Sequence, residues 1–199
     1  MIKKLINLQI LQSRKKLLKL KKEGHQLSWV IFTEISEDGG WQKQHIKRKK
    51  SQIKKITNEY SFNNVFEFGY APGTLDKVPI SEIIFKIKKV LSKLKPELIL
   101  LPHHADIHTD HQVSHQAIMS SSKNFRNKFI KTILAYETLS ETEFSAPIPE
   151  NAFLPNYYVD ITKNMKKKLE IMKVYSEEVM KDPYPRSISS IRALARLRG

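Results

Sequence analysis

The segment Pro102–His115, with the sequence PHHADIHTDHQVSH, contains most of the side chains of this chain that could carry out chemistry. Four of the seven histidines fall between positions 103 and 111, together with Asp106 and Asp110. Imidazole and carboxylate groups are ligands that suit zinc, and a neutral imidazole can also transfer protons near neutral pH. The segment therefore predicts one half of a metal-dependent hydrolytic site, against the alternative that its histidines are ordinary structural residues.

The residues of this segment differ in the role that each could take. A catalytic zinc binds three protein ligands and one water, and further carboxylates hold the ligating imidazoles through hydrogen bonds. Asp106 and Asp110 are candidates for that supporting role. His115 lies one helical turn after His111, and we expect it to be structural rather than a ligand.

The elements around the cluster must place it where a ligand can bind. Residues 97–102 (ELILLP) are continuously apolar, which is typical of a strand buried on both faces of a sheet. Apolar strands alternate with amphipathic helices, which predicts an α/β domain with a parallel sheet and helices on both faces. We expect strands at 27–35, 63–70, 97–102, 129–138 and 157–161, and helices at 11–23, 42–60, 81–95, 112–122, 162–180 and 187–197. Ligands of such sheets bind beyond the carboxyl ends of the strands, which is where the cluster begins.

The composition limits the class of protein. The chain has 199 residues, 40% of them hydrophobic, which is enough for one folded domain. It contains no cysteine, which excludes disulfides and thiolate metal sites and favours a cytoplasmic location. No apolar run is long enough to span a bilayer, and no signal-peptide cleavage site follows the first residues. The net charge of +15 allows attraction to phosphates, but the lysines are spread along the chain, as on a solvated surface.

The segment DIHTDH (106–111) resembles the D-x-H-x-D-H segment of the PIG-L/LmbE-like family of zinc-dependent de-N-acetylases. The similarity continues in order through four further stretches, LLKLKKEGHQLSWVIFTE, ILAYET, AFLPNYYVDIT and YSEEVMKDPYPRSISSIRALARLRG. It covers residues 17–199, with residues 1–16 divergent, and implies one domain over 1–199. The expected fold is a Rossmann-like, three-layer α/β domain with a mostly parallel sheet whose first strand is lost or altered.

The resemblance implies a role for each matched residue. His111 corresponds to a zinc ligand, and His108 to the histidine that protonates the leaving amine or stabilises the oxyanion. Asp110 corresponds to the aspartate between them, which we expect to fix the tautomer of an imidazole. Asp106 corresponds to a supporting position. Arg186 lies in an Arg-Ser turn that contacts the substrate or is structural.

The first strand departs from the family pattern. In the family it ends in His-Pro-Asp-Asp, which supplies two zinc ligands and the general base, whereas Leu5–Gln9 reads LINLQ and the first acidic residue is Glu23. Three interpretations follow: a fragment of an active enzyme, a member that keeps the fold without catalysis, or a site in which His103, His104 or Asp106 replaces the lost ligands. Since two of three zinc ligands have no counterpart at the expected place, we expect weak zinc binding by this chain.

The resemblance implies a zinc-dependent hydrolase that removes acetyl groups from an N-acetylglucosamine-like sugar or glycoconjugate, with little or no activity in this chain. The alternative is a non-catalytic basic module that binds phosphate-rich or anionic glycan partners. No nucleic-acid-binding motif is found, so nucleic acid is not an expected partner. The sequence carries no signal for a particular oligomeric state.

Overall fold

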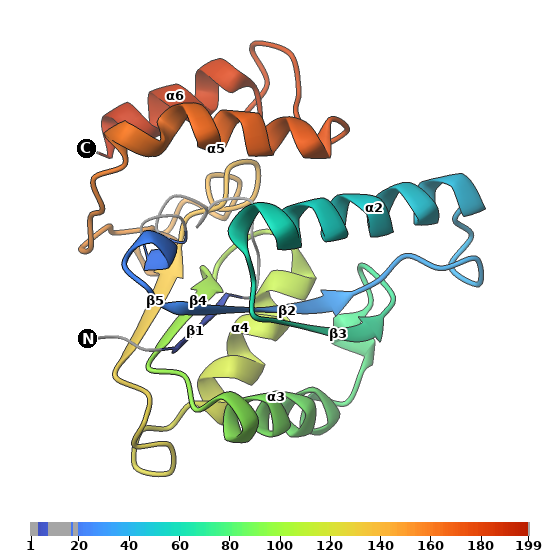
Figure 1. The fold of residues 1–199 in the computed structure, drawn as a ribbon, viewed down its shortest axis with the longest axis vertical. Helices are drawn as coiled ribbons and strands as arrows, with labels where there is room; N and C mark the ends of the chain where they lie inside the picture. Colours follow the sequence, from blue (N-terminus) through green and yellow to red (C-terminus); the bar gives the residue numbers. More distant parts are fainter. Residues whose placement is uncertain (1–3, 8–16, 18–19, 199) are drawn as a thin grey trace.

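The computed structural model describes residues 4–7, 17 and 20–198, with side chains described for 17 and 20–198 (Figure 1). The strands are β1 (Lys4–Asn7), β2 (Gln26–Thr33), β3 (Asn64–Tyr70), β4 (Leu98–Pro102) and β5 (Thr132–Tyr136). The α-helices are α2 (Lys43–Tyr60), α3 (Ile80–Leu94), α4 (Thr109–Ser121), α5 (Met165–Met172) and α6 (Ile188–Leu197). Short 3-10 turns lie at Leu75–Lys77, Pro149–Asn151, Thr162–Asn164 and Lys173–Tyr175. No helix in this part of the chain is both long and apolar enough to cross a bilayer.

The five strands form one parallel sheet in the order β3-β2-β1-β4-β5. All five residues of β4 are buried, which confirms the prediction from its apolar sequence. β1 is the central strand, because Leu5 pairs with Leu27 of β2 on one side and with Leu98 of β4 on the other. The first strand is therefore present in its place, and its sequence is what differs from the family pattern.

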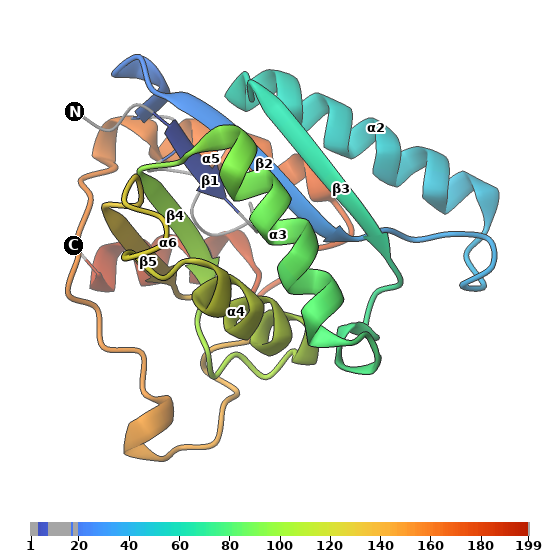
Figure 2. The same cartoon turned by 90° about the horizontal axis from the view of Figure 1, so that it is seen from below.

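Helices cover both faces of the sheet, which gives the expected three layers (Figures 1 and 2). On one face α3 and α4 pack through a cluster that includes Ile87 and Ile118. On the other face α2 and the segment around Tyr175 pack against Leu27 and Leu98. α6 adds a smaller cluster with α5 beyond this layer. The two faces are thus closed, and the carboxyl edge is left for a site.

Two sequence predictions at the C-terminal end are wrong in detail. Residues 157–161 form no strand, and Tyr157 and Tyr158 are exposed. Their β-propensity has no effect because no neighbouring strand pairs with them, and propensity in a sheet depends on such packing. The helix expected at 162–180 is divided, because 3-10 turns at 162–164 and 173–175 flank the short helix α5.

Candidate functional site

The cluster occupies the loop after β4 and the first turns of α4. His108 is the N-cap of α4, and its Nδ1 atom accepts a hydrogen bond from the backbone N–H of Asp110 at 3.2 Å. The imidazole therefore takes the place of the hydroxyl or carboxylate usual at this position. Because Nδ1 is an acceptor, the neutral ring carries its proton on Nε2.

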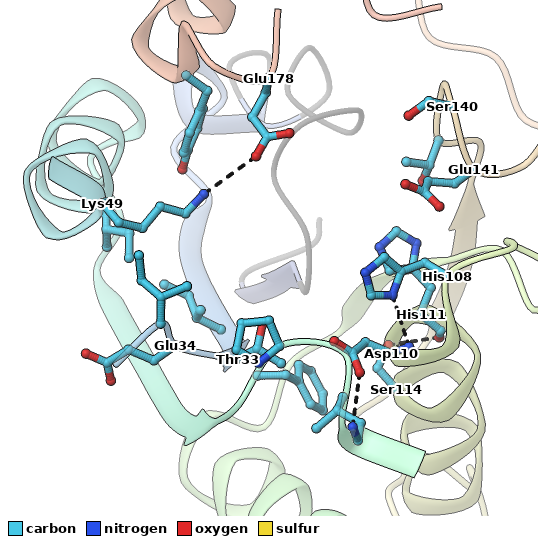
Figure 3. Close-up of a pocket in the computed structure, with 18 of the residues that line it drawn as sticks. Thr33, Glu34, Lys49, His108, Asp110, His111, Ser114, Ser140, Glu141 and Glu178 are labelled. Carbon is cyan, nitrogen blue, oxygen red and sulfur yellow. Dashed lines mark hydrogen bonds and ion pairs between the residues drawn. The ribbon is translucent and has the colours of Figure 1, made fainter. Parts of the chain in front are cut away.

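A cavity of about 490 Å³ lies in front of this helix start, at the carboxyl ends of β2 and β5 (Figure 3). Four of the residues singled out from the sequence line it: His108, Asp110, His111 and Arg186. The loop after β4, the loop after β5 and the turn before α6 thus contribute to one site, although Arg186 is far from the others in sequence.

His111 is held by a chain of two hydrogen bonds. Its Nδ1 atom lies 2.8 Å from Oδ2 of Asp106, and Oδ1 of Asp106 accepts a hydrogen bond from Thr142 at 2.6 Å. Asp106 is fully buried, so this carboxylate fixes the ring with a protonated Nδ1 and makes Nε2 the acceptor nitrogen. The ring of His111 stacks on that of His108 with 5.0 Å between centroids. The pair offers a donor from His108 and an acceptor from His111.

The side chain of Asp110 contacts backbone groups rather than an imidazole, so of this residue only the backbone N–H acts on a tautomer, that of His108. Its two carboxylate oxygens accept hydrogen bonds from the backbone N–H groups of Gly73 at 2.7 Å and Leu75 at 3.1 Å. Gly73 has a positive φ of 71°, a backbone conformation that residues with a side chain rarely adopt. Asp106 is the aspartate that orients His111, and Asp110 joins the start of α4 to the loop after β3.

The remaining histidines of the segment lie outside the cavity. His104 is exposed, and its Nε2 atom lies 3.1 Å from the carbonyl oxygen of Glu150. His115 contacts the carbonyl oxygen of Pro102 through Nδ1 at 2.8 Å. Burial lowers the pKa of His103 and the pKa of His115, and the neighbouring His104 lowers both further. These three form a separate group of adjacent rings, and the structure gives His115 the structural role expected for it.

The wall opposite the histidines carries paired charges (Figure 3). Lys49 of α2 lies 3.8 Å from Glu178, and Arg186 forms an ion pair with the same carboxylate. Lys50 pairs with Glu34 at 3.2 Å. Arg186 therefore has a carboxylate partner from its own region, which accounts for its position without any ligand.

Glu141 lines the cavity on the same side as His108 and His111, and sequence reasoning missed it (Figure 3). It follows β5 by a few residues, in a turn where Ser140 has a positive φ of 70°. Burial raises the pKa of the Glu141 carboxyl, and the nearby His111 and His108 act in the opposite direction. Its position just after the end of a parallel strand was the available signal.

The residues of the site do not fit the zinc centre that the sequence resemblance implies. Within the described residues, no three His, Asp or Glu side chains come together in a way that could hold a metal ion. The residues outside the described part are of other types and add no such ligand. Asp106 and Asp110 are engaged by protein donors. No chemical step through zinc is therefore assigned to this chain.

The place of the missing His-Pro-Asp-Asp is at the centre of this edge. Leu5 to Asn7 belong to β1, between β2 and β4, whereas Leu8 and Gln9 lie outside the described residues. None of these positions carries an acidic or imidazole side chain. The imidazole half of the family pattern is thus present on α4, and its β1 half is absent from the sequence.

Comparison with known families decides the relationship. The profile described as PIG-L, GlcNAc-PI de-N-acetylase, matches residues 9–122, which is more than half of the chain. The chain belongs to the PIG-L family. The matched part of this PIG-L protein includes both His108 and His111. No curated protein matches the chain.

Solved structures agree with the PIG-L fold. The N,N'-diacetylchitobiose deacetylase of Pyrococcus horikoshii superposes with a TM-score of 0.70 at 18% identity, covering 100% of this chain and 79% of the other. The zinc inhibited form of teicoplanin deacetylase gives 0.72 at 10% identity, covering 98% and 94%. The 4-carboxy-2-hydroxymuconate hydratase of Pseudomonas putida gives 0.71 at 13% identity, covering 100% and 86%. One fold thus serves deacetylases and a hydratase, so the chemistry must be argued from the site.

Proposed function

We propose that this PIG-L chain, folded as one domain over 1–199, binds an amino sugar of the N-acetylglucosamine type, as part of a glycoconjugate, in the cavity beside His108 and His111. We further propose that it releases acetate slowly or not at all. The observation that carries this proposal is a cavity lined by the stacked rings of His108 and His111, combined with a set of described ligands too small for a metal ion.

The two imidazoles suit a sugar that carries an amide or amine. His108 presents a ring N–H, because its Nδ1 is occupied as an acceptor, and His111 presents an acceptor nitrogen, because Asp106 holds its Nδ1 proton. A sugar hydroxyl or an amide offers both a donor and an acceptor, so one ligand group can contact both rings. Trp41 also lines the cavity, is 45% exposed and offers an apolar surface to the C–H face of a sugar ring.

Calorimetric titration with the methyl glycosides of N-acetylglucosamine and of glucosamine tests the binding claim. We expect saturable binding that His108→Ala weakens by about tenfold, the equivalent of about 1.4 kcal/mol. The matched control is His104→Ala, because His104 belongs to the same segment but lies outside the cavity. Absence of binding by both glycosides, or equal loss in the two variants, contradicts the proposal.

A further inference from the structure

We infer that Glu141 is a recognition residue for a cationic amine, so that the cavity prefers the free amino sugar to its acetylated form. This inference rests on the proposed function, since it names the state of the sugar that the same cavity takes. Four carboxylates of the described residues line the cavity, and they differ in what each of them contacts.

Three of the four cavity carboxylates already have partners. Asp110 accepts two backbone hydrogen bonds, Glu34 pairs with Lys50, and Glu178 pairs with Lys49 and Arg186. Glu141 differs from these, because no hydrogen bond or ion pair joins its carboxylate to another described residue; His111, His108 and Arg186 act on it only through the electrostatic field. A partly buried carboxylate without a partner is costly, and a cation beside it offsets that cost.

The charge balance of the cavity points the same way. Of the described lining residues, four are acidic and three are basic, which leaves a net charge of −1 with histidine neutral. The chain as a whole carries +15. The three basic side chains pair with two carboxylates, Glu178 and Glu34. Asp110 and Glu141 are therefore the lining carboxylates without an ion pair among the described residues, and Asp110 is held by two backbone N–H groups. The site is therefore locally suited to a cation on a strongly basic protein.

Polar groups next to Glu141 also lack partners. Thr138 and Ser140 both line the cavity, and their side-chain oxygens are buried without a hydrogen bond to any residue that the structure describes. Unsatisfied buried hydroxyls call for an explanation, and rotation about one side-chain bond can turn such a group toward a ligand. Hydroxyls flanking a carboxylate match a ligand in which hydroxyls flank an ammonium, as in a 2-amino sugar.

The test compares calorimetric titrations of methyl glucosaminide and methyl N-acetylglucosaminide, slightly below neutral pH, where the free amine is protonated. We expect the native chain to bind the free amine about tenfold more tightly. Glu141→Gln should remove this preference while leaving the affinity for the acetylated sugar within about twofold. The matched control, Glu67→Gln on the exposed face of β3, should keep the preference.

Because Glu141 is unpaired, Glu141→Gln should fold at least as stably as the native chain, and Glu141→Ala gives the same comparison if it does not. Equal affinity for the two glycosides in the native chain overturns the inference, as does a preference that survives in both Glu141 variants. Binding of neither glycoside contradicts the proposed function, and the inference falls with it. Binding of both glycosides without preference contradicts the inference alone.

Discussion

Among single residues, Asp106, His103 and His115 determine how the protonation of the segment after β4 changes with pH. Asp106 is buried and held by His111 and Thr142, whereas His103 and His115 are packed where charge is unfavourable. Burial, followed for His103 by the charge of His104, lowers the pKa of these two imidazoles, although Asp106 acts to raise both. The protein therefore keeps two neutral histidines beside a fixed carboxylate.

This arrangement predicts that the free energy of unfolding falls in mild acid. The unfolded chain binds protons at these histidines with a pKa near the ordinary 6.5, and the folded chain binds them only at lower pH. Their stabilising effect is thus complete above about pH 6.5 and is lost as the pH falls through that value toward the folded pKa. Urea unfolding as a function of pH measures the decline.

The variant His115→Gln should reduce this decline, because glutamine can still donate to the carbonyl oxygen of Pro102 but does not titrate. His45→Gln, on the partly exposed α2, is the matched control and should leave it unchanged. A pH profile that is flat in the native chain, or unaffected by His115→Gln, contradicts the assignment.

At the scale of elements, Asp110 links the start of α4 to the loop after β3. Its two accepted hydrogen bonds predict that Asp110→Ala loosens this loop and lowers the free energy of unfolding by about 1–3 kcal/mol. Hydrogen exchange at the amides of Gly73 and Leu75 should quicken by about tenfold or more. Asp76→Ala, in the same loop but exposed, is the control. Unchanged exchange at both amides would show that the link is dispensable.

The elements show how far the sequence leads. The apolar run at 97–102 placed the cluster at the correct edge of the sheet, because such a run is typical of a strand buried on both faces. The resemblance gave the contact with an imidazole to the side chain of Asp110, whereas the structure gives it to Asp106, because the contact depends on the path of the loop between β4 and α4. Glu141 escaped notice because a single glutamate in a turn has no spacing pattern. The central β1 was also uncertain, since a strand of four residues gives little periodicity.

For the whole molecule, the main feature is the contrast between a family fold and an incomplete set of family ligands. The fold agrees with the PIG-L family, to which the chain belongs, and the imidazole pair lines a cavity at the carboxyl edge of the sheet. The central strand lacks every side chain that could complete a metal site, and the structure brings no substitute from elsewhere in the described residues. We therefore propose that the chain can bind an amino sugar without hydrolysing it.

Acetate release from a methyl N-acetylglucosaminide by the purified 199-residue chain, in the presence of added zinc, tests this proposal most directly. We predict a rate equal to the background and equal to that of His111→Ala, because one imidazole without further ligands does not hold the ion. Zinc-dependent release of acetate that a chelator abolishes and that His111→Ala removes would contradict the account.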